Sequence, residues 1–341
     1  MADTFDSLLG EFEKTPVKET MTGKKLSTTA CVNEIVNSIM GVIAATSGDA
    51  IVEMCIDKVK ERVEKEIGVI PKRIEIHGMD QVKVMQGAVH EKFETVLDMV
   101  SIDIPVYLTG KAGTGKNVIC KQVADALGLD FYFTNAVTQE YKLTGFIDAN
   151  GVYQPTQFYE AFTKGGLFFL DEMDASVPET LVILNAAIAN KYFDFPCGKK
   201  EAHPNFRVIA AGNTLGTGAD INYTGRYSLD RASLNQFVIV KIDYSPAIEE
   251  SLSMGNTELL DFVHAFRDAT DKAGVECLCS YRNIDYISKL ETRMKKLDEV
   301  LDVALTKGLD IDTLNVIRSR LKENPAMEGN RYYKAILKIK N

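Results

Sequence analysis

The stretch that decides the fold is GKAGTGKN, residues 110–117. A short apolar run ending at Leu108 precedes it, and VICKQVADALG, which has the apolar spacing of a helix, follows it. A strand, a glycine-rich turn and a helix in this order are typical of a phosphate-binding loop. An ordinary glycine turn in front of a helix has the same local pattern, so the loop alone favours a nucleotide site without excluding that alternative.

The residue types in this loop suit the chemistry of a phosphate. Glycines let backbone N–H groups turn inward, and the following helix adds its positive N-terminal end. Lys116 can reach the β- and γ-phosphates as a point charge. Asn117 stands where a Ser or Thr hydroxyl usually binds Mg²⁺, and an amide oxygen is also a hard, neutral ligand. The predicted nucleotide-binding residues are Gly110, Lys111, Ala112, Gly113, Thr114, Gly115, Lys116, Asn117 and Val118.

A second signature is the run GGLFFLDE, residues 165–172. Its apolar part predicts a buried parallel strand, and ligands of open α/β sheets bind at the carboxyl ends of such strands. Asp171 would hold Mg²⁺, directly or through water, and Glu172 would orient and polarise the attacking water. Acidic residues also end many ordinary strands, but together with the upstream loop they favour an ATP hydrolase. We expect nearby Asp174 to be a helix cap or a surface acid.

Three further apolar runs predict the rest of the sheet, at residues 130–134, 206–212 and 237–242. The middle run is followed by Asn213. Its amide could hold the attacking water or contact the γ-phosphate, although an Asn at the end of a strand is often only a turn residue.

Length, composition and net charge limit the class of protein to which this chain can belong. The chain has 341 residues, 45% hydrophobic and 26% charged, which are the proportions of a soluble folded protein. The net charge of −9 argues against a surface that binds nucleic acid throughout, although a local basic patch is not excluded. The acidic start MADTFDSLLGEFEK lacks the features of a secretion signal, and no apolar run is long enough to span a bilayer. We therefore expect a cytoplasmic protein with no membrane contact and with six reduced cysteines.

The sequence divides into three predicted parts. Residues 1–72 have the pattern of a polar arm followed by a helical hairpin. Residues 73–245 form a predicted nucleotide-binding α/β core, with short hairpins expected around 143–153 and 191–200. Residues 246–341 have helical apolar spacing and form a predicted lid with a C-terminal extension.

The order of GKAGTGKN, GGLFFLDEMD, VIAAGNT and a later SYR resembles that of AAA+ ATPases. It is most similar to the MoxR, CbbQ and CobS-like branch, in the broad group that includes midasin and dynein motors. The segment LTGFIDANGVYQPTQF resembles the helix-2 insertion of that group, and KYFDFPCGKKEAHPNF resembles its hairpin before the sensor strand. The resemblance covers roughly residues 74–290 and implies a five-stranded parallel sheet between helices, a helical lid and usually a hexameric ring.

The resemblance also implies roles for single residues. Lys116, Asp171 and Glu172 match the two Walker motifs, Asn213 matches sensor 1, and Arg282 in the SYR segment matches sensor 2. The implied cofactors are ATP and Mg²⁺.

An arginine finger is the one expected part without a clear match. Relatives often carry Arg-Phe before the last strand, where this chain has Gln236-Phe237. Arg226 and Arg231 are the available substitutes, and the position of Arg226 in a glycine loop favours it as the finger that completes a neighbouring subunit's site.

Three functions remain open at this point. The first is an ATP-driven ring motor that remodels an unknown protein substrate or adaptor, as chaperone-like relatives do. The second is a nucleic-acid motor, against which the acidic charge and the lack of a dedicated nucleic-acid module argue. The third is a nucleotide-gated scaffold with weak hydrolysis, which Asn117 and Gln236 allow.

Overall fold

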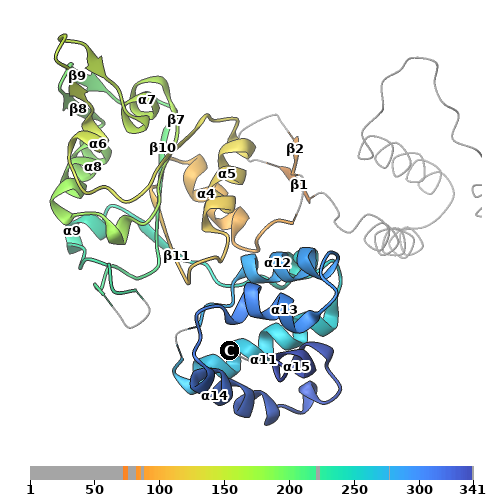
Figure 1. Ribbon diagram of the computed structural model, residues 1–341. Helices are drawn as coiled ribbons and strands as arrows, with labels where there is room; N and C mark the ends of the chain where they lie inside the picture. The colour runs from red at the N-terminus through yellow and green to blue at the C-terminus, as the bar shows by residue number, and fades with distance from the viewer. Residues whose placement is uncertain (1–71, 76–81, 86–87, 220–222, 276, 340–341) are drawn as a thin grey trace, which may run out of the picture. The chain divides into compact units, whose positions relative to one another are not determined.

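A computed structural model describes residues 72–75, 82–85, 88–219, 223–275 and 277–339. Its centre is a five-stranded sheet in which every neighbouring pair of strands is parallel. The strands in spatial order are β11 (Val238–Lys241), β3 (Val106–Thr109), β10 (Phe206–Gly212), β7 (Gly166–Leu170) and β4 (Phe131–Thr134). Figure 1 labels β7, β10 and β11 of this sheet. The prediction of a five-stranded parallel sheet is confirmed.

The inner strands are buried because helices cover both faces of the sheet. In β3, Val106 and Leu108 pack in one hydrophobic cluster and Tyr107 packs in another. Successive side chains of a strand point to opposite faces, so this division shows that neither face of β3 meets solvent. A strand covered on both faces needs apolar residues at every position, which is why these runs are continuous in the sequence.

Two pairs of helices supply the cover. Helices α4 (Phe93–Ser101) and α5 (Lys116–Leu127) contribute to the cluster of Val106. Helices α7 (Gln157–Lys164) and α8 (Pro178–Asn190) contribute to the cluster of Tyr107. A proline at the first helical position, as in α8, is well tolerated because its missing N–H has no intrahelical partner there.

In the described part of the chain, three antiparallel pairs of short strands lie outside the main sheet. They are β1 (Lys72–Glu75) with β2 (Val82–Met85), β5 (Phe146–Ile147) with β6 (Tyr153–Gln154), and β8 (Tyr192–Phe195) with β9 (Gly198–Glu201). The last two pairs are the expected hairpins with different bounds. Residues 141–144 form a short helix, α6 (Tyr141–Thr144), so the first hairpin begins later than expected, and β9 carries the second hairpin to Glu201.

The C-terminal part is helical, as predicted. It follows the short helix α9 (Arg231–Leu234), and its hydrophobic cluster draws its buried residues from 259–339 alone. Its helices are α10 (Pro246–Leu252), α11 (Thr257–Ala273), α12 (Tyr281–Glu291), α13 (Leu297–Leu301), α14 (Ile311–Lys322) and α15 (Arg331–Ile336). Short 3-10 or π turns are η1 (Met173–Ala175), η2 (Asp302–Thr306) and η3 (Pro325–Met327).

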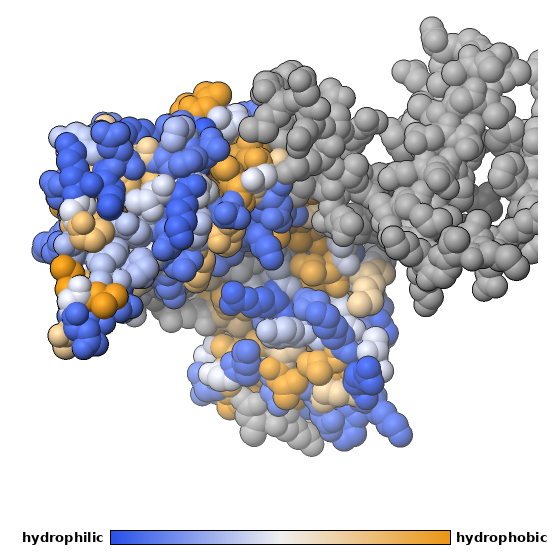
Figure 2. Space-filling view, turned by 90° about the horizontal axis from the view of Figure 1, so that it is seen from above, coloured by the Kyte–Doolittle hydropathy of each residue, from blue (hydrophilic) through white to orange (hydrophobic). Residues whose placement is uncertain are grey.

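Three further points concern the N-terminal part, membrane-spanning helices and the surface. The N-terminal arm and the helical hairpin fall outside the described residues, so the division into three parts stays a prediction. No helix in the described part of the chain has the length and apolarity to cross a membrane. On the face that Figure 2 shows, hydrophobic residues form several separate patches between hydrophilic ones.

Candidate nucleotide site

The phosphate loop joins β3 to α5, as its sequence predicts. Gly113 and Gly115 have φ of 75° and 84°, which side chains with a Cβ rarely adopt. Thr114 is buried, and its hydroxyl donates to the carbonyl of Lys111 at 2.9 Å. The glycines in this loop therefore allow the inward turn of the backbone on which phosphate binding depends.

Lys116 is the central cation of the site. Its ammonium donates to the carbonyls of Gly110 and Lys111 at 2.7 and 3.1 Å, and to Oδ1 of Asn213 at 3.0 Å. Burial lowers the pKa of Lys116 to about 8, while the carboxylates of Asp171 and Asp174 act against that shift. The loop lysine and the predicted sensor amide therefore lie in contact, although they are 97 residues apart in the sequence.

The two predicted Mg²⁺ ligands also lie in contact. Nδ2 of Asn117 donates to Oδ2 of Asp171 at 2.7 Å. Carboxylate and amide oxygens suit Mg²⁺, which is usually held by one or two protein groups together with waters and substrate phosphates. Rotation of the Asn117 amide would present its oxygen to the same space, so the residues present fit the ion.

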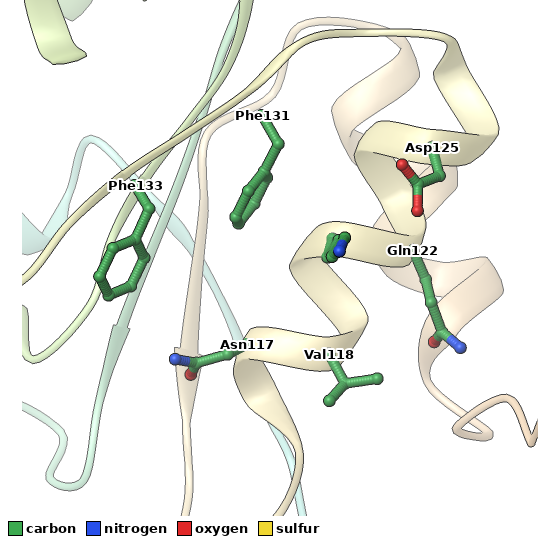
Figure 3. Close-up of a pocket in the computed structure, with 7 residues that line it drawn as sticks. Asn117, Val118, Gln122, Asp125, Phe131 and Phe133 are labelled. Atoms are coloured by element: carbon green, nitrogen blue, oxygen red, sulfur yellow. The ribbon is translucent and has the colours of Figure 1, made fainter.

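A groove of about 360 Å³ opens beside Asn117, between α5 and the edge strand β4. Figure 3 shows Asn117 and Val118 at one end of it, with Phe131 and Phe133 on the strand side. Val118 is exposed and lines this groove, so its side chain belongs to the surface of α5.

Glu172 follows Asp171 with an unusual backbone. Its φ is 52°, in the left-handed region that residues other than Gly, Asn and Asp seldom adopt. The Glu172 N–H donates to Oδ1 of Asp171 at 2.9 Å, and its side chain is 40% exposed. The carboxylate predicted to activate water is therefore accessible and held next to the predicted metal ligand.

Asp174 contradicts the expectation of a helix cap or surface acid, because it is fully buried. Its Oδ2 accepts hydrogen bonds from the N–H groups of Asn213 and Thr214, at 3.0 and 2.9 Å, and from the Thr214 hydroxyl at 2.9 Å. Its Oδ1 pairs with Nη1 of Arg226 at 3.1 Å. No local signal in the sequence could have found this role, since the partners of Asp174 lie about 40 and 52 residues further along the chain.

The three candidate arginines lie in different surroundings. Arg226 is nearly buried and bridges two carboxylates of its own chain, with Nη2 3.3 Å from Oε1 of Glu172 and Nη1 against Asp174. Arg231 begins α9 and Arg282 lies in the first turn of α12; both are exposed. Within the described residues neither side chain has a hydrogen bond or an ion pair.

The helical part contacts the phosphate loop through other residues. The Tyr281 N–H points at the carbonyl of Gly113 at 3.4 Å, and a Cβ at Gly113 would lie 2.5 Å from the Cβ of Ser280. The Tyr244 hydroxyl reaches the carbonyl of Ala112 at 3.5 Å. Lys111 forms an exposed ion pair with Asp271 at 3.3 Å. The start of α12, where the SYR segment lies, thus adjoins the loop.

A further contact joins the loop to the segment that carries Arg226. The Ala112 N–H donates to the Tyr223 hydroxyl at 3.0 Å, and the Arg226 guanidinium lies 5.9 Å from the Tyr223 ring. Of the predicted residues outside the loop, Asn213 and Asp171 contact it through Lys116 and Asn117. Glu172 contacts Asp171, and Arg226 contacts Glu172. Val118, Arg231 and Arg282 are the exceptions.

Comparisons with known proteins agree with this geometry. Residues 105–224 match the family model of the AAA domain, dynein-related subfamily. An uncharacterized protein of Staphylococcus epidermidis is 24% identical over 198 residues, which are 52% of this chain and 72% of that protein. One of Staphylococcus saprophyticus is 25% identical over 165 residues, 45% of this chain and 60% of that protein.

Among solved structures, NtrX from Brucella abortus in complex with ADP has 14% sequence identity and a TM-score of 0.44, covering 96% of this chain and 86% of that one. The match to the AAA domain over residues 105–224 agrees with the strand order and the helical C-terminal part, and together they show an AAA+ type α/β fold.

Proposed function

We propose that this protein binds and hydrolyses ATP with Mg²⁺, as a motor of the MoxR, CbbQ and CobS-like kind that remodels a protein partner. One observation carries the proposal. The phosphate-loop lysine, the sensor amide and the acidic pair meet at the carboxyl ends of three adjacent strands, β3, β10 and β7. Ligands of open α/β sheets bind at this edge.

The roles of the residues follow from their positions. The loop N–H groups and Lys116 would bind the phosphates, and Asn213 would orient Lys116 and the γ-phosphate. Asp171 and Asn117 would hold Mg²⁺, which supplies charge neutralisation of the phosphates when bound. Glu172, with its exposed carboxylate, would accept a proton from the attacking water.

Two substitutions test hydrolysis. Lys116→Ala should abolish ATP binding, measured by calorimetry, because the loop loses its cation. Glu172→Gln should bind ATP normally and lose turnover, measured as phosphate release, since only the activation of water is removed. Glu179→Gln, an exposed acid in the first turn of α8, is the matched control and should behave as wild type. Equal loss of ATP affinity in both site variants would reject the role of Glu172.

The proposal of a protein partner rests on the hairpin of β5 and β6. Phe146, Ile147 and Val152 are about half exposed there, at 48%, 51% and 54%. Adjacent exposed apolar side chains commonly mark contact sites for other proteins. An unfolded model protein should therefore stimulate ATP turnover. Phe146→Ser with Ile147→Ser should remove the stimulation, while Val316→Ser, an exposed apolar position on α14, should not.

The expectation of a ring also belongs to this proposal. Arg231 is exposed at the start of α9 and is available to a second copy of the chain. A cation supplied by a neighbouring subunit can raise the rate of phosphoryl transfer by about 10³ to 10⁵. Light scattering should show that ATP favours a larger species, consistent with a hexamer. A monomer that hydrolyses ATP at the full rate would reject the ring.

A further inference from the structure

Asp174 joins two strand ends that the proposed reaction needs in a fixed geometry. Its carboxylate is fully buried and accepts hydrogen bonds from the N–H groups of both Asn213 and Thr214. It thereby fixes the backbone from which the Asn213 side chain reaches Lys116. A Cβ on Gly212 would lie 2.9 Å from Cγ of Asp174, so the absence of a side chain at this position permits the close approach.

Arg226 extends this connection to Glu172. One guanidinium nitrogen pairs with Asp174 and the other lies 3.3 Å from Glu172. The segment that carries Arg226 is fastened by its backbone as well, because the Tyr227 N–H donates to the carbonyl of Asp174 at 2.8 Å. The planar, forked guanidinium suits a bridge between two carboxylates, whereas the ammonium of a lysine is a point charge without this fork.

We propose that Asp174 and Arg226 are a positioning pair that acts within one subunit: Asp174 fixes the sensor strand, and Arg226 holds the Glu172 carboxylate in register with it. This inference rests on the proposed hydrolysis of ATP. It assigns Arg226 a place in its own subunit's site and leaves Arg231 as the candidate for the neighbour's site.

Burial explains why Arg226 stays within its own subunit. Its side chain is 11% exposed and that of Asp174 is 0% exposed. A buried carboxylate that loses its cation keeps an uncompensated charge, which is strongly unfavourable. Movement of Arg226 into another subunit's site would therefore separate a buried ion pair, while Arg231 would lose no such partner among the described residues.

The kinetic test uses Arg226→Ala, Arg226→Lys, Asp174→Asn and the double variant Asp174→Asn with Arg226→Ala. Arg226→Ala, Asp174→Asn and the double variant should each lower kcat by about 10- to 100-fold with a small change in KM, the size usual for residues that orient a reacting group. Arg226→Lys should recover part of kcat. The double variant should be no slower than the slower single variant, because both members act through one connection.

Controls separate positioning from loss of fold. Thermal unfolding of each variant fixes a temperature at which all are folded, and kcat is compared there. Arg293→Ala, an exposed arginine on the surface of the helical part, should leave kcat unchanged. An unchanged kcat in Arg226→Ala, or multiplied losses in the double variant, would overturn the proposal.

Mixing experiments decide between action within and between subunits. If Arg226 acts within its own subunit, Arg226→Ala mixed with Lys116→Ala should stay as slow as the separate variants, since each subunit's site lacks one part. Recovery in that mixture would place Arg226 in the neighbour's site and overturn the proposal. If wild type and Glu172→Gln turn over ATP equally, the proposed function is wrong, and this inference is wrong as well. If the mixture recovers activity while Glu172→Gln stays inactive, only this inference is wrong.

Discussion

The phosphate loop has two neighbours that contact it in different ways. On the strand side, Lys116 meets Asn213, and charged groups continue through Asp174 and Arg226 to Glu172. On the helical side, the Tyr281 N–H points at the carbonyl of Gly113 and the Tyr244 hydroxyl reaches the carbonyl of Ala112. The rings of these two tyrosines pack against each other, with 5.2 Å between their centres. The Lys111–Asp271 ion pair on that side is exposed and contributes little.

This difference separates two tasks. Charged groups with fixed hydrogen bonds suit the stabilisation of developing charge, which needs preorganisation. Neutral packing contacts can be broken and remade without leaving a buried charge unpaired, so they suit a part that closes on the loop and opens again. We therefore expect changes on the strand side to act chiefly on turnover and changes on the helical side to act chiefly on nucleotide affinity. Tyr281→Phe tests this division directly, and three further predictions concern the loop and its strand side.

The largest effect is expected for Gly212→Ala on the strand side. A Cβ there would lie 2.0 Å from the hydroxyl of Tyr107, which is fully buried. Overpacking of this kind costs about 1–3 kcal/mol of unfolding free energy or more. Chemical denaturation should show the loss, and Gly225→Ala, whose Cβ would meet no atom within 4 Å, should show almost none. Equal unfolding free energies of the two variants would contradict the prediction that the strand side is tightly packed around Gly212.

Tyr281→Phe tests the helical side. The buried Ser245 N–H donates to the Tyr281 hydroxyl, so the variant leaves a buried donor without its partner. The expected loss is about 1–2 kcal/mol in unfolding free energy, with a weaker affinity for ATP and a nearly unchanged kcat. Tyr286→Phe, on the exposed side of the same helix, is the control. A selective fall in kcat would break the proposed division.

The pH dependence of ATP affinity concerns Lys116. Burial holds its pKa at about 8 in the folded protein, against an ordinary value of 10.5. Phosphate binding favours the charged ammonium, so above about pH 8 ATP binding must take up a proton. Calorimetry should then show an affinity that falls by up to about tenfold per pH unit between pH 8 and 9.5. Lys116→Arg stays charged over this range, and any affinity it retains should not follow this slope.

The smallest effect is expected for Asn117. Asn117→Ala removes a ligand predicted for Mg²⁺ and the hydrogen bond to Asp171, and should raise the Mg²⁺ concentration for half-maximal turnover a few-fold. Asn117→Thr should return this Mg²⁺ concentration to the wild-type value, because a threonine hydroxyl is the ligand usual at this position. A requirement that is unchanged in the alanine variant would show that Asn117 acts only as a partner of Asp171.

The sequence predicts the sheet well because its signals are local. Fully buried strands must be apolar at every position, so the runs ending at Leu108 and Leu170 stand out, and the strand ends carry Asp171 and Asn213 into one site. The hairpins were predicted with wrong bounds because strands of two to four residues have too few positions for a clear period. The roles of Lys116, Asp171 and Glu172 in catalysis stay predictions, although their mutual positions agree with them.

The pairing of Asp174 with Arg226 could not be predicted. It depends on a long-range contact between a turn after β7 and a loop after β10, and neither residue has a local pattern that names its partner. Nor could the sequence distinguish the three candidate arginines by burial, because the burial of Arg226 depends on its long-range contact with Asp174.

The left-handed backbone of Glu172 has a consequence for how this position can change. Its φ of 52° favours Asn or Gly, and either replacement would relieve strain in the turn after β7. Neither Asn nor Gly would supply a side-chain carboxylate at the distance from the backbone that glutamate gives. The proposed role of Glu172 in turnover and the backbone conformation at this position therefore favour different amino acids, and the chain carries the one that this backbone accommodates less well.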